Sequence, residues 1–129
     1  MRVARPTTDL IRIRDFYEVG LGLRVLWQFV DHDGFDGIVF GLGGTASPDT
    51  AQLELVRTPH GTVPRPTAED ALVLYVATLD DVNEMSAQLR RVDAVEVAAD
   101  DVELNPYWPK TGSRTFIDPD GYRVIIALG

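Results

Sequence analysis

The sequence contains no cysteine, so the chain can form neither disulfides nor thiolate metal sites. It also lacks any apolar run near the ~18 residues that a membrane-spanning helix needs. The first ten residues, MRVARPTTDL, have no apolar stretch of the kind found in a secretory signal. These absences predict a cytoplasmic protein without membrane contact.

Positive charge is also scarce, because 12 Lys and Arg residues face 20 Asp and Glu residues and the net charge is −8. Such a field repels phosphate backbones and attracts cations, so nucleic acid is not expected as a partner. The remaining composition, 45% hydrophobic and 25% charged, is that of a soluble globular domain. A length of 129 residues indicates a single domain, and no second core is expected.

The first half of the chain predicts a β-α-β-β-β order of elements. An extended segment, residues 2–6, precedes an amphipathic helix over residues 9–19, with Leu10, Ile13, Phe16 and Tyr17 on one stripe. A turn-forming cluster at residues 32–37 joins two segments rich in β-formers. The strands are expected at residues 24–31, 38–42 and 52–58, with a Gly/Ser/Pro loop before the last one.

The second half repeats this order after a proline-rich connector, residues 59–70. It predicts a strand at 71–77, a helix at 79–91 opened by Thr78, and later strands at 95–99, up to 117, and 122–128. The chain is therefore expected to hold an N-terminal module (1–58), the connector, and a C-terminal module (71–129). A turn over Asp118 and Asp120, whose side chains bond nearby backbone amides, precedes the closing strand.

Three stretches carry a resemblance to a known family: TDLIRIRDFYEVGLGL (8–23), LEL (53–55) and FIDPDGYRVIIAL (116–128). Together they resemble the vicinal-oxygen-chelate superfamily, which includes glyoxalase I, extradiol dioxygenases, fosfomycin-resistance enzymes and bleomycin-resistance proteins. The resemblance covers essentially the whole chain. It implies an α+β fold of two βαβββ modules, whose curved mixed sheets surround an open cup with the helices outside.

The resemblance also implies four metal-ligand positions, usually His or Gln and Glu, on the first and last strands of each module. In this sequence they fall on Arg2, Glu54, Ala71 and Ile125, so only Glu54 is a donor. A divalent ion needs about three or more protein donors to compete with hydration. We therefore expect no metal and no cofactor, unless a shifted register or a subunit contact supplies other ligands.

Strand alternation predicts which side chains line the cup. In residues 52–55 the two leucines face the helices, while Gln52 and Glu54 face the cup. The same parity places five residues of the second module on the cup side: Val73, Tyr75, Arg123, Ile125 and Ala127. Two interpretations of Glu54 remain open, a salt bridge to Arg2 or Arg123 and a carboxylate that contacts a ligand.

Aromatic side chains outside the helices also have two interpretations each. Tyr107 and Trp108, in a proline-flanked loop, either rim the cup and stack on a ligand or fill a dimer seam. Trp27 and Phe29 share one face of their strand, which favours core or interface packing. His32 lies in a predicted hairpin tip and is expected to be solvated.

These observations favour a metal-free binding protein of the bleomycin-resistance type over an enzyme. The resemblance implies an acidic homodimer that sequesters a cationic or aromatic molecule. No catalytic or metal-binding residue is predicted. The alternatives are a glyoxalase-like lyase or isomerase or a dioxygenase, and a structural or regulatory protein whose cup is filled by its own side chains. The candidate ligand-binding residues are Glu54, Tyr75, Tyr107, Trp108, Arg123 and Ile125.

Overall fold

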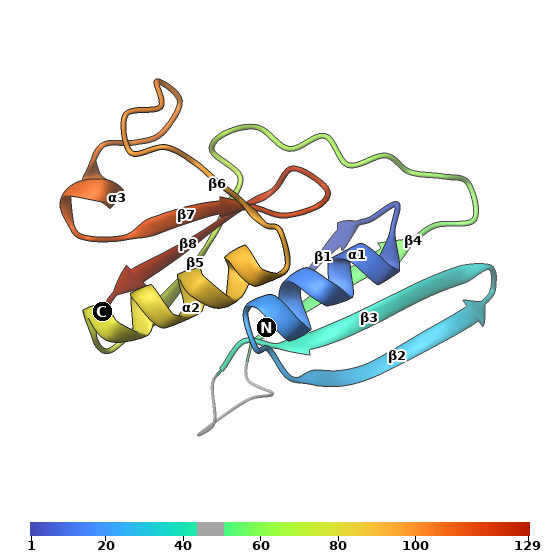
Figure 1. Cartoon of the computed structure of the whole chain (residues 1–129). Helices are drawn as coiled ribbons and strands as arrows, with labels where there is room; N and C mark the ends of the chain where they lie inside the picture. The colour runs from blue at the N-terminus through green and yellow to red at the C-terminus, as the bar shows by residue number, and fades with distance from the viewer. Residues whose placement is uncertain (44–50) are drawn as a thin grey trace. The chain divides into compact units, whose positions relative to one another are not determined.

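The computed structural model describes residues 1–43 and 51–129, and most of the loop predicted before Gln52 lies outside them. The chain divides into two compact units, Met1–Pro64 and Arg65–Gly129 (Figure 1). Each unit has its own four-stranded mixed sheet and its own helical elements, as expected for two βαβββ modules. Within the described residues, no helix is long and apolar enough to cross a membrane.

The N-terminal unit has the sheet order β1-β4-β3-β2, in which β1 is parallel to β4 and the other neighbours are antiparallel. Figure 1 shows its helix lying against the strands of this sheet. The elements are β1 (Arg2–Pro6), α1 (Leu10–Arg14), η1 (Asp15–Gly20), β2 (Val25–His32), β3 (Phe35–Gly41) and β4 (Gln52–Arg57).

The helix of this unit starts as predicted but does not remain an α-helix. Asp9 caps it, since its Oδ1 accepts hydrogen bonds from the backbone N–H groups of Ile11 and Arg12. From Asp15 onward the helix widens into the π-helix η1, where Leu21 N–H donates to the Phe16 carbonyl five residues back. Phe16 and the adjacent Tyr17 are both buried there.

The core of this unit lies between the helix and one face of the sheet. Leu53 and Leu55 are fully buried, as the alternation predicts, and so is Ile13 on the helix. The Tyr17 and Phe40 ring centroids are 5.5 Å apart, which joins the helix to β3. The opposite face of the same sheet therefore carries Glu54 and its neighbours.

The C-terminal unit has the sheet order β5-β8-β7-β6, with β5 parallel to β8. Its helix α2 has the predicted bounds, because Thr78 and Asp81 form a reciprocal capping box at its start. The elements are β5 (Ala71–Val76), α2 (Leu79–Arg91), β6 (Val95–Glu96), α3 (Tyr107–Lys110), β7 (Arg114–Ile117) and β8 (Arg123–Leu128).

Two predictions for this unit need correction. The strand expected over residues 95–99 ends at Glu96, although Val97 N–H still donates to the Thr115 carbonyl at 2.8 Å. Residues 107–110, predicted as loop, form the short helix α3, because Asn105 Oδ1 accepts a 3.0 Å hydrogen bond from the Tyr107 N–H and opens the turn.

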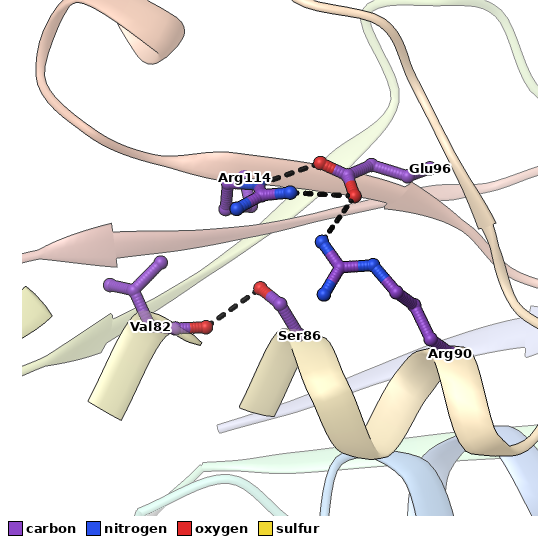
Figure 2. Close-up of polar contacts among 5 residues, drawn as sticks. All are labelled: Val82, Ser86, Arg90, Glu96 and Arg114. Carbon is purple, nitrogen blue, oxygen red and sulfur yellow. Dashed lines mark hydrogen bonds and ion pairs between the residues drawn. The ribbon is translucent and has the colours of Figure 1, made fainter. Parts of the chain in front are cut away.

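The helix-facing side of this sheet contains a cluster of polar contacts (Figure 2). Glu96 accepts hydrogen bonds from Arg114 of β7, at 2.6 and 2.9 Å, and from Arg90 of α2, at 2.8 Å. Partial burial alone would raise the pKa of the Glu96 carboxyl, but the bonds to Arg114 and Arg90 hold that pKa below its ordinary value. The ion pairs therefore tie α2 to the sheet at neutral pH.

We expect Glu96→Gln to lower the free energy of unfolding by about 1 kcal/mol at pH 7, since two partly exposed ion pairs are lost. Because the folded-state pKa lies below the ordinary 4.5, this stabilisation is present above that pH and disappears as pH falls through the folded pKa. Urea denaturation from pH 7 to pH 3 should therefore show the variant and the parent converging in acid. Glu84→Gln, at an exposed position of α2, is the control, and a pH-independent difference would contradict the assignment.

Candidate functional site

The N-terminal sheet carries a pocket of about 320 Å³ on the face opposite the helix, lined by Arg2, Trp27, Phe29, His32 and Glu54. We call it the N-terminal pocket. In the sheet register Glu54 pairs with Val39, and Val39 pairs with Trp27, so these three side chains emerge on one face. The pocket therefore combines residues from β1, β2 and β4.

Arg2 organises this pocket through three contacts. Its Nη1 donates to Glu54 Oε1 at 2.9 Å, and its Nε donates to Gln52 Oε1 at 2.9 Å. Its guanidinium carbon lies 4.7 Å from the centroid of the Trp27 ring, a cation–π distance. Of the two interpretations of Glu54, the salt bridge is present, and its partner is Arg2, not Arg123.

Phe29 lies flat on the sheet because its cross-strand partner is Gly37. A Cβ atom at Gly37 would come within 2.3 Å of Phe29 Cζ, so any larger residue would push the ring away from the sheet. The ring of His32 stands edge-on to Phe29, with centroids 6.3 Å apart. Trp27 is 44% exposed, so it is a pocket wall and not a core residue of its unit.

The C-terminal sheet carries a second pocket, of about 330 Å³, which we call the C-terminal pocket. Its floor comes from two paired strands, where Ala71 lies beside Arg123 and Val73 beside Ile125. Trp108 of α3 and the segments that flank the sheet form its walls. The full lining is Ala68, Glu69, Ala71, Val73, Glu103, Leu104, Asn105, Trp108, Arg123 and Ile125.

Arg123 is the unusual residue of this pocket. It is only 9% exposed, and its side chain forms no hydrogen bond or ion pair with any residue that the structure describes. Its backbone N–H donates to the Asp70 carbonyl, which fixes the start of β8 beside the connector. Ile125, two residues along the same face, is 3% exposed and contributes hydrocarbon to the pocket.

The predicted ligand-binding residues are distributed unevenly over the two pockets. Glu54 lines the N-terminal pocket, whereas Trp108, Arg123 and Ile125 line the C-terminal pocket. Tyr75 and Tyr107 line neither of these two pockets. Tyr75 is 65% exposed and lies over the terminal Gly129, and Tyr107 is 58% exposed and stands edge-on to Trp108.

Several lining residues were not predicted from the sequence. Trp27 and Phe29 share the strand parity that leads to the Glu54 face, so the alternation of β2 and β3 was the signal that could have identified them. His32 was predicted to be solvated, and it is exposed, but it also lines the N-terminal pocket, which was not predicted. Glu69, Glu103 and Asn105 come from irregular segments, where no periodic pattern exists to predict their direction.

The four positions at which the superfamily holds a metal do not fit a divalent ion in this chain. The Glu54 carboxylate is bonded to a guanidinium, and Ile125 and Ala71 offer only hydrocarbon. Across residues 1–43 and 51–129, no group of three or more His, Cys, Asp and Glu side chains is placed to hold a metal ion. A divalent cation would lose hydration energy on binding here, and a single carboxylate that already pairs with Arg2 would not compensate for that loss.

Comparison with known proteins gives the family. Residues 1–48 match the YycE-like N-terminal domain, and residues 69–127 match the YycE-like C-terminal domain. The uncharacterized protein YycE of Bacillus subtilis is 36% identical over 126 residues, which cover 97% of this chain and 84% of that protein. The chain belongs to the YycE-like family.

Solved structures agree with the fold of the YycE-like chain. The crystal structure of a YycE protein of unknown function from Bacillus subtilis matches with a TM-score of 0.84 and 34% identity, over 100% of this chain and 88% of that one. Glyoxalase I of Leishmania major matches at 0.70 and 23% identity, over 98% and 84%, and this shows the fold alone. The resemblance to the vicinal-oxygen-chelate superfamily is therefore confirmed.

Proposed function

We propose that this YycE-like chain binds a small organic molecule and does so without a metal ion. The observation that carries the proposal is the Arg2 guanidinium held on the Glu54 carboxylate, at the place where a superfamily enzyme would use that carboxylate as a ligand. A positive group 2.9 Å from the carboxylate repels a second cation at the same site. Without a metal, this face of the N-terminal sheet offers the pocket lined by Trp27, Phe29 and the Arg2–Glu54 pair as a surface for binding.

Both pockets have the features that small-molecule sites share. Their volumes, about 320 and 330 Å³, lie at the lower end of the ~300–1,000 Å³ range of such sites. In the N-terminal pocket, Trp27 and Phe29 offer apolar ring surface for stacking. Because Arg2 already shares the Glu54 charge, a cationic ligand gains little there from Glu54, and ring contact with an aromatic ligand is the stronger attraction.

The metal-free part of the proposal is tested by elemental analysis of protein purified without chelators. We expect metal well below one equivalent and no change of melting temperature with Zn²⁺, Ni²⁺, Mn²⁺ or Fe²⁺. A ligand present at a hundred times its dissociation constant stabilises the folded protein by ~2.7 kcal/mol, so specific metal binding would give a measurable rise in melting temperature. The same assay with a set of planar aromatic compounds tests small-molecule binding, where saturable stabilisation is expected.

Glu54→Gln is the matched control for the metal measurement. A metal-induced shift that survives this substitution arises elsewhere on the acidic surface. A stoichiometric metal that is lost in Glu54→Gln would contradict the proposal and would favour the alternative, a glyoxalase-like lyase or isomerase or a dioxygenase.

A further inference from the structure

Arg123 is a charged residue with low exposure, and its side chain has no partner among the described residues. As a residue it is only 9% exposed, and it lines the C-terminal pocket. None of its nitrogen atoms is among the fully buried polar atoms without a partner, so the guanidinium donors stay open to the pocket. A positive group placed in this way is available to a ligand of opposite charge.

We propose that the C-terminal pocket binds a small monocarboxylate, whose carboxylate pairs with the Arg123 guanidinium. This inference rests on the proposed small-molecule binding and names the chemical class of the ligand and its anchor. A guanidinium presents parallel N–H donors that match the two oxygens of a carboxylate, and such bidentate pairs are among the stronger hydrogen-bonded contacts in proteins.

Asn105 supplies a second donor to the same pocket. Its Oδ1 accepts the hydrogen bond from the Tyr107 N–H, so the amide orientation is set. The amide nitrogen then has no partner among the residues described in the structure, and Asn105 lines the pocket together with Arg123. A side-chain amide nitrogen only donates hydrogen bonds, so it suits an acceptor such as a carboxylate oxygen.

The rest of the lining suits an apolar body attached to the carboxylate. Val73, Ile125 and Leu104 contribute aliphatic surface, and the half-buried Trp108 contributes an indole ring. A pocket of about 330 Å³ has room for a single small ring system with a short side chain. An apolar ring therefore adds affinity that a simple inorganic anion would not gain.

The charge of the remaining lining limits the ligand to one negative charge. Glu69 and Glu103 line the same pocket, and the chain as a whole carries a net charge of −8. One carboxylate can be neutralised by Arg123, but a second negative group would face these glutamates without a partner. Dicarboxylates and phosphate esters are therefore disfavoured relative to monocarboxylates.

The experiment uses the two tryptophans of the chain, of which Trp27 lines the N-terminal pocket and Trp108 the C-terminal pocket. In the Trp27→Phe protein, the remaining fluorescence reports on Trp108. Benzoate, phenylacetate and cyclohexanecarboxylate are titrated into it beside their neutral primary amides and beside phthalate, a dianion. At least one acid should bind saturably and at least about tenfold more tightly than its own amide and than phthalate.

Variants identify the anchor. Arg123→Gln should weaken binding of that acid at least about tenfold, and Arg123→Lys should restore part of it. Arg91→Gln, at an exposed position of α2 that lines neither pocket, should leave it unchanged. Three results would each overturn the proposal: no saturable binding of any acid at millimolar concentration, an amide that binds as tightly as its acid, or affinity that is unaltered in Arg123→Gln. None of these three results would affect the metal analysis, which tests the proposed function separately.

Discussion

Replacing Arg123 with methionine should raise the free energy of unfolding of the unliganded protein by up to about 1 kcal/mol, although it removes the proposed ligand anchor. Methionine is long, flexible and apolar, so it can fill the space of the Arg123 stem beside Ala71 without an unpaired charge in the pocket. Urea denaturation of the parent and the variant measures the difference. A gain in stability is the opposite of what most substitutions at a buried position produce.

Arg123→Lys is the control for this prediction, since it keeps the charge and most of the length. It should show no gain in stability. If Arg123→Met instead lowers the free energy of unfolding, Arg123 is a structural residue with a stabilising role, and the unpaired charge is not evidence of a ligand.

Asp118→Ala should lower the free energy of unfolding by about 2–3 kcal/mol. Asp118 is 3% exposed, and its Oδ1 accepts hydrogen bonds from the backbone N–H groups of Asp120 and Tyr122, both at 2.9 Å. Gly121, at φ 93°, completes the turn in a conformation that disfavours other residues. Without the carboxylate, two amides at the entry to β8 lose their acceptor. Thermal or urea denaturation measures the loss.

Asp118→Asn separates the hydrogen bonds from the charge. The side-chain amide oxygen can accept the same two bonds, so this variant should retain more than half of the stability that alanine loses. Equal losses in both variants would mean that the carboxylate charge, and not the geometry of the turn, stabilises this part of the unit.

Much of the fold could be predicted because local signals agreed with one another. For α2, the capping residues Thr78 and Asp81 coincide with the start of the apolar stripe, and its bounds were predicted correctly. The role of Asp118 in its turn was also predicted correctly, because the side chain of an Asp before Pro-Asp-Gly can reach the backbone amides that follow it. The π-helix η1 was not predicted, since a period of 3.6 residues describes a helix stripe equally well whether or not one turn widens.

The candidate site was predicted only in part, for a different physical reason. Alternation tells which face of a strand a side chain occupies, and this was enough to offer a salt bridge of Glu54 with Arg2 or Arg123 as one of two interpretations, of which the structure shows the pair with Arg2. It does not tell how far a long side chain reaches across the sheet, so the contact of Arg2 with Trp27, on the opposite edge strand, was missed. Residues outside the strands, such as Asn105, have no such constraint.

The ion pair of Arg2 and Glu54 also bears on how a protein of this kind can change in evolution. Loss of Arg2 alone would leave a carboxylate that is 19% exposed without its partner, and a new acidic side chain at Ile125 would enter a site that is 3% exposed. Each of these two substitutions alone is thus unfavourable, so a set of metal ligands at these positions would need several changes at once.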